Sequence, residues 1–145
     1  MRGLTNRVAV VTGGAAGIGA AICRFLARDG ADVAIWDWNT SAAQVLVEEI
    51  VAMGRKAVVC KVDVSNKNDI ESAVKAVHEN LGLVSILVNN AGVSPEKDFV
   101  DITLDDWNEV FDINMKGMFM CTQSVIHDMI DARWGRVINI SSSSA

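Results

Sequence analysis

The sequence predicts an α/β fold in which helices cover both faces of a doubly wound, parallel β-sheet. Short apolar runs alternate with longer segments of helical period, which is the pattern of repeated βαβ units. The short runs are apolar at consecutive positions, as in strands that are buried on both faces. Half of the 145 residues are apolar and no repeat or linker interrupts the pattern. We therefore expect a single domain over residues 1–145.

Five runs rich in valine, isoleucine and alanine predict the strands. They are bounded by glycine, asparagine, aspartate or serine, which favour turns. The predicted strands cover residues 7–12, 32–37, 56–63, 85–92 and 136–141. In a sheet of this kind ligands bind beyond the carboxyl ends of the strands, near the point where the strand order reverses.

Helical periodicity between the strands predicts the crossover helices, at residues 18–29, 41–53, 66–81 and about 104–132. Ser41 and Ser65 precede two of these segments and are predicted to cap them, and Thr103 with Asp106 resembles a capping box. Glycines stand where left-handed helix ends are expected, at Gly30, Gly54 and Gly82.

Charge and hydropathy exclude two classes of partner. The net charge is −5 and no basic cluster is present, so nothing indicates binding to nucleic acid or to an anionic membrane. No apolar stretch approaches the roughly 18 residues of a membrane span, and the N-terminus leads straight into a strand without a signal-peptide core. A cytoplasmic protein is expected.

The cysteines and histidines do not form a recognisable site in the sequence. Cys23, Cys60 and Cys121 are odd in number and widely separated, so we expect buried free thiols and neither a disulfide framework nor a metal site. His78 and His127 lie in helical segments of mixed polarity, where a surface histidine or one with a structural partner is favoured over a catalytic one.

A glycine-rich loop joins the first strand to the first helix in the stretch VVTGGAAGIGA. Gly13 can adopt the positive φ of the tight turn, Gly17 can let a pyrophosphate approach the backbone, and Gly19 can let the helix pack near the strand. Ala16 and Ile18 complete the predicted phosphate-binding turn, whose free N–H groups and helix dipole favour an anion. The alternative is a tight turn without a ligand. A P-loop is disfavoured because no Gly-Lys-Ser/Thr follows.

Asp37 ends the second strand, where a carboxylate can accept hydrogen bonds from the adenosine ribose of a dinucleotide. It would repel a 2′-phosphate, and Ala16, Trp38 and Asn39 stand where a cation that binds this phosphate could be. We therefore predict NAD in preference to NADP, with Trp38 beside the cofactor. The alternative is an aspartate that only caps residues 40–42.

Several spaced motifs in order resemble the short-chain dehydrogenase/reductase family, in its single-domain branch. With Thr12 the loop reads T-G-x-x-x-G-x-G, and it is followed by DV at 63–64, NNAG at 89–92, IN at 113–114 and GRVINISS at 135–142. The resemblance covers the whole chain. It implies a Rossmann-like fold, here ending after about five strands, hydride transfer between a nicotinamide cofactor and an alcohol or ketone, and a homo-oligomer at full length.

The resemblance also implies roles for single residues. Asp63 with Val64 would contact the adenine, Asn90 would lie along the adenosine ribose, and Gly92 belongs to a motif that supports the central sheet. Asn114 matches a helix asparagine that holds a water of the proton relay; the alternative is a surface or backbone-bonded asparagine. Ser142 matches the serine that orients the substrate oxygen, with Ser141 as the second choice among the four serines 141–144.

The chain departs from the family in one respect, because it contains no tyrosine. The family's general acid/base is a tyrosine in a Y-x-x-x-K motif, and by resemblance this motif would fall beyond Ala145. A serine hydroxyl is too weak an acid to replace a phenol. We therefore expect a fragment of a longer reductase, without turnover by itself; the alternative is a complete short protein that keeps the nucleotide site without catalysis.

Two classes of function follow from the sequence. The first is the cofactor-binding half of an NAD-dependent oxidoreductase that interconverts a secondary alcohol and a ketone. The second is a binding module, a nucleotide sensor or subunit that uses the same pocket without chemistry. An epimerase of the family's longer branch is disfavoured because its glycine loop is spaced differently. No anion clamp in residues 93–98 indicates the substrate.

Overall fold

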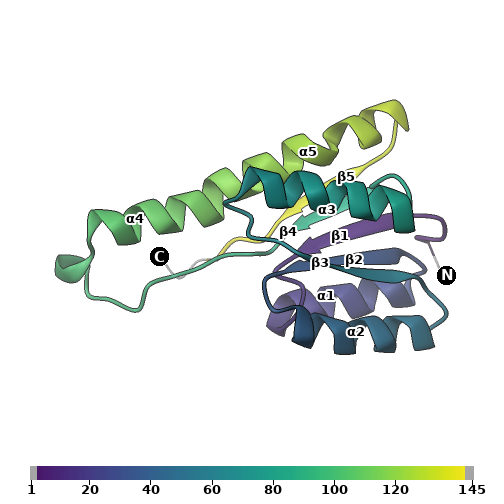
Figure 1. Ribbon diagram of the computed structural model, residues 1–145, viewed down its shortest axis with the longest axis horizontal. Helices are drawn as coiled ribbons and strands as arrows, with labels where there is room; N and C mark the ends of the chain where they lie inside the picture. The colour runs from purple at the N-terminus through teal and green to yellow at the C-terminus, as the bar shows by residue number, and fades with distance from the viewer. Residues whose placement is uncertain (1–2, 143–145) are drawn as a thin grey trace.

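A computed structural model describes residues 3–142 and contains one parallel sheet between two layers of helices (Figure 1). The five strands are β1 (Val8–Thr12), β2 (Asp32–Asp37), β3 (Ala57–Lys61), β4 (Ile86–Asn89) and β5 (Arg136–Asn139). They are arranged in the order β3-β2-β1-β4-β5, and every pairing is parallel. The strand order therefore reverses between β1 and β4, and the predicted fold class is confirmed.

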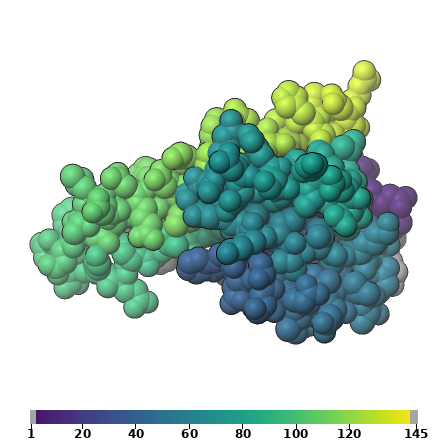
Figure 2. Space-filling view, viewed as in Figure 1, coloured from purple at the N-terminus to yellow at the C-terminus, as the bar shows by residue number. Residues whose placement is uncertain are grey.

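Four crossover segments cover the two faces of the sheet. Helices α1 (Gly17–Arg28) and α2 (Thr40–Ala52) lie on one face, and α3 (Lys67–Asn80) and α5 (Met118–Asp131) lie on the other (Figure 1). A short 3-10 turn, η1 (Phe99–Asp101), helix α4 (Leu104–Phe111) and a π-helical turn, η2 (Asp112–Gly117), lead into α5. In the space-filling view the η1 and α4 region projects from the body of the molecule (Figure 2).

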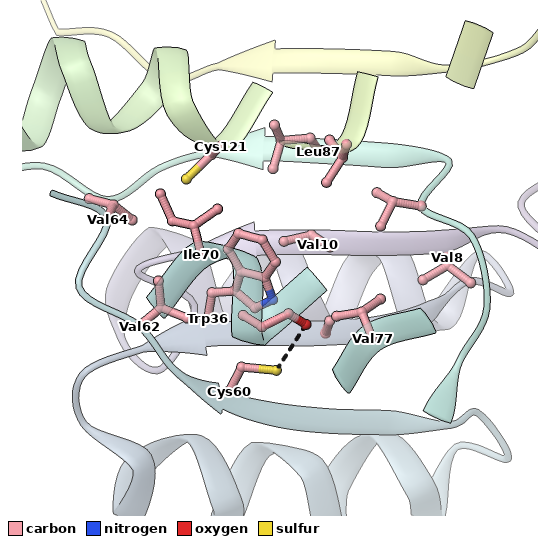
Figure 3. Close-up of a cluster of buried hydrophobic side chains, with 14 of the residues drawn as sticks. Val8, Val10, Trp36, Cys60, Val62, Val64, Ile70, Val77, Leu87 and Cys121 are labelled. Carbon is pink, nitrogen blue, oxygen red and sulfur yellow. Dashed lines mark hydrogen bonds between the residues drawn. The ribbon is translucent and has the colours of Figure 1, made fainter. Parts of the chain in front are cut away.

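Each face of the sheet carries its own apolar core. All five residues of β1 are buried, and they alternate between the two cores: Val8 and Val10 belong to the core under α3 and α5, Ala9 and Val11 to the core under α1 and α2. Figure 3 shows the first of these cores, where Trp36 lies among aliphatic side chains and the two thiols of Cys60 and Cys121. Burial on both faces explains the continuous apolar runs of the sequence.

The fifth strand differs from this expectation. All four residues of β5 are exposed, and the side chains of Val137 and Ile138 are among the exposed large apolar groups. The strand pairs with β4, but within residues 3–142 no strand pairs with its other edge. The prediction of burial on both faces is therefore wrong for this strand.

The helix boundaries correct three predictions. Helix α2 is capped by Asn39, whose side chain accepts the Ala42 N–H, and α3 is capped by Asn66, so neither predicted serine cap forms. The long helix predicted over residues 104–132 is interrupted by the π-helical turn η2. The capping box of Thr103 and Asp106 is confirmed. The three glycines predicted at helix ends have positive φ: Gly30, Gly54 and Gly82.

Candidate functional site

Two cavities lie at the carboxyl ends of the strands, near β1 and β4, between which the strand order reverses. The larger has a volume of about 670 Å³ and the smaller of about 280 Å³. They share part of their walls, formed by Val64, Ala91, Gly92, Val93 and Ile113. Ligands of open α/β sheets bind at this place.

The loop between β1 and α1 borders the smaller cavity through Gly13, its flanking residues Thr12 and Ile18 line the larger one, and it has the geometry that its glycines predict. Gly13 has a φ of +60° and donates its N–H to the Trp36 carbonyl at 2.8 Å. A Cβ on Gly19 would collide with the Gly13 carbonyl oxygen, so the helix approaches the strand as closely as its backbone allows. Gly17 has a φ of +51° and no neighbour within 4 Å of a Cβ position, so the space beside it is open to a ligand.

Helix α1 begins beside this open space with unsatisfied donors. Its N-cap, Ala16, provides no side-chain hydrogen bond, and the first turn contains no acidic residue. The first N–H groups of a helix have no intrahelical partner and attract anions. Because the turn is open and its amides are uncapped, the residues present fit the pyrophosphate of a dinucleotide.

Asp37 fixes the glycine loop to the end of β2. Its side chain is buried, with 8% of the residue exposed. One carboxylate oxygen accepts the Ala15 N–H and the other accepts the Asn39 N–H, both at 2.9 Å. The alternative of a simple cap on residues 40–42 is wrong, because Asn39 performs that role. Asp37 therefore holds a negative charge at the wall of the smaller cavity.

The smaller cavity is also lined by Trp38, Asp63 and Val64, which are predicted on the adenosine side, whereas Asn90, predicted along the adenosine ribose, lines the larger cavity. Asp63 lines the smaller cavity and accepts both the N–H and the hydroxyl of Ser65 on one carboxylate oxygen, at 2.9 and 2.7 Å. Val64 is buried, whereas Trp38 is 81% exposed at the edge of the cavity. The segment after β3 thus places a carboxylate, and the segment after β2 an aromatic ring, at the same cavity.

A network of hydrogen bonds ties β4 to the glycine loop. The Asn90 side-chain amide donates to the carbonyls of Thr12 and Gly13, each at 3.0 Å. The Thr12 hydroxyl oxygen accepts the N–H groups of Asn90 and Ala91, also at 3.0 Å. Asn90 lines the larger cavity, and its side-chain nitrogen is directed to the loop. The sequence alone does not predict this bridging position of Thr12.

Asn114 lies in η2 and pairs with the loop that follows β4. Its side-chain oxygen accepts the Val93 N–H and its side-chain nitrogen donates to the Val93 carbonyl, both at 2.8 Å. Of the alternatives open in the sequence, the structure shows a backbone-bonded side chain. The π-helical turn places Asn114 on Val93 and Gly117 against Val64, where a Cβ on the glycine would approach a Val64 methyl to 2.8 Å.

The end of β5 leads into the larger cavity. The Ile140 N–H donates to the Asn89 carbonyl at 2.9 Å, and Ser141 and Ser142 line the cavity after it. The Asn89 side-chain amide donates to the Asn139 side-chain oxygen at 2.9 Å and so fixes β5 beside β4. Ser143 and Ser144 lie outside the described residues. The structure therefore brings Asn114, Ser141 and Ser142 to one cavity.

The two histidines lie apart from the cavities, whereas Cys121 lines the larger cavity and Glu109 lines the smaller one. His78 contacts Asp128 at 2.7 Å between α3 and α5, and His127 is exposed. The three thiols are buried, and burial raises the pKa of Cys23 and Cys121 to about 12 and of Cys60 to about 11, which favours the protonated form at neutral pH. Residues 3–142 contain no group of three or more acidic, histidine or cysteine side chains placed to hold a metal, and no helix there has the length and apolarity of a membrane span.

The fold is a Rossmann-like α/β fold with an open glycine loop at the point where the strand order reverses. The family model described as short chain dehydrogenase matches residues 7–145, and the chain belongs to this family. Oxidoreductases of the family use NAD or NADP as cofactor.

Curated relatives and a solved structure agree with this assignment. A 3-oxoacyl-[acyl-carrier-protein] reductase of Synechocystis sp. is 36% identical over 98% of this chain and 58% of its own length. A cyclopentanol dehydrogenase of Comamonas sp. is 37% identical over 96% of this chain and 56% of its own. A crystal structure from Sinorhizobium meliloti, assigned as a short-chain alcohol dehydrogenase, superposes with a TM-score of 0.91 at 35% identity and covers 97% of this chain and 56% of that one. The chain spans little more than half the length of these relatives.

Proposed function

We propose that the chain forms the cofactor-binding part of an NAD-dependent oxidoreductase that interconverts a secondary alcohol and a ketone. The observation that carries this proposal is the pair of joined cavities beside the glycine loop, with Asp37 at the wall of the smaller one. When bound, the nicotinamide would supply or accept a hydride. The adenosine side would lie between Asp37, Trp38 and Asp63, and the nicotinamide side would lie in the larger cavity.

The preference for NAD rests on the charge of Asp37. Two like charges about 4 Å apart repel by roughly 1 kcal/mol in water and by about 4 kcal/mol at the effective dielectric of a protein surface. The backbone N–H groups of Ala15 and Asn39 hold the carboxylate in place, so it cannot turn away from a 2′-phosphate without losing both hydrogen bonds. No lysine or arginine lines the smaller cavity among the described residues.

Residues of the larger cavity are proposed to act on the substrate. The Ser142 hydroxyl would donate a hydrogen bond to the substrate oxygen, with Ser141 as the alternative. Both polar atoms of the Asn114 side chain bond to Val93, so a relay water would use the remaining lone pair of its oxygen or its main-chain carbonyl. The proton donor is proposed to be a tyrosine outside this chain, since the chain contains none.

Cofactor titration tests the first part of the proposal. The 145-residue chain is expected to bind NADH at least about tenfold more tightly than NADPH by calorimetry, given the repulsion above. Asp37→Asn removes the charge and should narrow this ratio, while Asp63→Asn serves as a control that removes a charge on the same cavity but at another strand. Tighter binding of NADPH by the unchanged protein would contradict the proposal.

Activity and gene structure distinguish the enzyme from the binding module. The reading frame should continue past Ala145 and encode a Y-x-x-x-K motif, and the full-length gene product should change the cofactor absorbance with secondary alcohols or ketones. A monodisperse 145-residue protein that binds NADH, from a gene without such a motif, would favour the module instead.

Oligomer formation by the longer protein is a further part of the proposal. Large apolar side chains of η1, α4, η2 and α5 are exposed, and two of them, Trp107 and Phe111, stack on each other: Phe99, Val100, Leu104, Trp107, Phe111, Met115 and Phe119. Exposed apolar side chains that gather on neighbouring elements favour an interaction site.

A further inference from the structure

We propose that Glu109 is a second recognition residue for the base of the dinucleotide, and that with Asp63 it selects a purine with a 6-amino group over one with a 6-oxo group. This inference rests on the proposed function and deepens it at the adenosine side of the site. It is carried by two carboxylates that separate elements bring to the wall of the smaller cavity.

The smaller cavity offers apolar contacts to a flat heterocycle. It is lined by the aromatic ring of Trp38 and by aliphatic side chains that include Val62, Val64 and Ile113. Aromatic rings stack on the faces of nucleobases, and aliphatic side chains pack against them. Such contacts hold one purine as well as another, so discrimination between purines has to come from polar groups at the edge of the ring.

Asp63 presents one such group in a fixed orientation. One oxygen of its carboxylate accepts the N–H and the hydroxyl of Ser65, at 2.9 and 2.7 Å. The main-chain N–H of Asp63 donates to the Asp69 carboxylate at 3.0 Å, which ties this segment to the first turn of α3. Among the described residues none donates to the second carboxylate oxygen of Asp63, so this oxygen can accept a hydrogen bond from a ligand.

Glu109 reaches the same cavity from α4. Ile113, about one turn further along the chain, lines the cavity too, so the two side chains lie on the same side of this helical segment. The segment is held close to the end of β3, because Gly117 packs against Val64, the residue that follows Asp63. The packing of η2 therefore brings the carboxylate of Glu109 to the cavity that Asp63 also lines.

Other carboxylates of α4 and η2 already have cationic partners. Asp106 binds Lys97 at 2.6 Å. Asp112 contacts Lys116 at 3.2 Å. Within residues 3–142 no cation pairs with Glu109, so its carboxylate can serve a ligand in the cavity.

Two carboxylates at one cavity select a donor. The 6-amino group of a purine has two N–H bonds, and each carboxylate can accept one of them. A 6-oxo group offers only lone pairs at the same position and would face two negative charges. A site built to accept an N–H rejects an analogue that lacks it. NAD should therefore bind better than nicotinamide hypoxanthine dinucleotide, which carries the 6-oxo group.

Calorimetry with the two reduced dinucleotides and the full-length gene product tests this selection. NADH should bind about tenfold more tightly than the hypoxanthine analogue, or better, the effect of one hydrogen bond to a charged group. Equal affinities overturn the selection of the base and leave the cofactor assignment intact. Failure of the protein to bind NADH overturns the proposed function, and this inference with it.

A substitution of Glu109 tests its share in the selection. Glu109→Gln keeps the length of the side chain, removes the charge and adds an N–H that can donate to a 6-oxo group. The ratio of the two affinities should fall by about fivefold or more in this variant. Asp105→Asn removes a charge from the same helix at a residue that does not line the cavity, and it should leave the ratio unchanged. An unchanged ratio in Glu109→Gln, or an equal fall in Asp105→Asn, overturns the role of Glu109.

A second ratio separates Glu109 from Asp37. Glu109 is assigned to the base and Asp37 to the ribose, so Glu109→Gln should change the ratio of NADH to NADPH affinity less than Asp37→Asn does. If both variants change this ratio equally, Glu109 acts through its charge on the 2′-phosphate, and its assignment to the base is overturned.

Discussion

At the scale of single residues, the glycine loop is built by contacts that leave no room for a side chain at one position and open space at another. Gly19 lies against the Gly13 carbonyl and near the side-chain nitrogen of Asn90, whereas Gly17 has no neighbour within 4 Å of a Cβ position. A glycine is required at position 19 by packing. At position 17 it is required by the positive φ and by the space that it leaves for a ligand.

Alanine substitutions should separate these two requirements. Gly19→Ala is expected to destabilise the fold by about 3 kcal/mol or more, because its Cβ overlaps backbone atoms that cannot move aside. Gly17→Ala should lower the free energy of unfolding by only about 1–2 kcal/mol, the cost of placing alanine in a left-handed conformation. Its larger effect should be a loss of affinity for NADH. Urea unfolding and calorimetry measure the two effects. Gly3→Ala, in open space, is the control, and equal losses in Gly17→Ala and Gly19→Ala would contradict the packing argument.

Trp36 carries a polar atom that its surroundings do not satisfy. Its Nε1 is buried without a hydrogen-bond partner among the described residues, in the core shown in Figure 3. Trp36→Phe removes this unpaired donor and should cost less than about 1.5 kcal/mol, since relief of a penalty of about 1–3 kcal/mol offsets lost packing. Trp36→Ala should cost about 3–5 kcal/mol. If urea unfolding shows that both variants lose a similar free energy of unfolding, the unpaired indole nitrogen does not destabilise the fold.

At the scale of elements, local patterns predict structure better than patterns that depend on distant contacts. The capping box at Thr103 is confirmed because both of its partners lie within one turn. The predicted cap at Ser65 fails because Asn66 stands one position closer to the helix and Ser65 bonds to Asp63 instead. The alternation of strands and helices is likewise local, so the fold class follows from the sequence.

The π-helical turn η2 could not be predicted in this way. It accompanies two contacts with residues far along the chain, Asn114 with Val93 and Gly117 with Val64. The candidate site also contains one part that the sequence predicts and one part that it does not. The glycine loop and Asp37 follow from a strand, a turn and a helix in sequence, whereas the bridge from Thr12 to Asn90 depends on the pairing of β1 with β4.

Helix α4 should lose stability on acidification. The hydrogen bonds from Lys97 and then Thr103 hold the pKa of Asp106 well below its usual range. A carboxyl whose pKa is lowered by folding contributes stability above its unfolded pKa of about 3.9, and this contribution is lost as the pH falls below that value. Asp106→Asn should therefore be less stable than the unchanged chain at about pH 7, and the difference should shrink toward about pH 3. Thermal unfolding of both proteins between about pH 7 and about pH 3 measures this difference in stability. If the difference does not change with pH, the charge of Asp106 does not contribute to the stability of the fold.

At the scale of the whole molecule, helices cover both faces of the sheet, but the edge strand β5 and the α4 region are exposed. Both cores are continuous through β1, β2 and β4. The exposed strand β5 and the exposed apolar side chains of η1, α4, η2 and α5 lie outside them, and the α4 region projects from the body (Figures 1 and 2). Stability therefore resides in the first four strands with α1, α2, α3 and α5.

The three buried thiols report on the opening of these cores. Because burial raises the pKa of Cys23, Cys60 and Cys121 to between about 11 and about 12, they remain protonated at neutral pH. Reaction with Ellman's reagent should be slow in the native chain and complete in denaturant. Lys75→Cys, at an exposed position of α3, should react at once and serves as the control. Rapid reaction of the native thiols would contradict the closed cores.

The wall shared by the two cavities has a consequence for how a two-part ligand binds. Residues 91–93 line both cavities, so in the proposed function each half of a dinucleotide would have its own pocket and the two pockets would be joined. Once one half is bound, the other binds as an intramolecular event at an effective concentration in the millimolar range. A dinucleotide should therefore bind with higher affinity than either mononucleotide. Each mononucleotide alone should compete with it for only one of the two cavities.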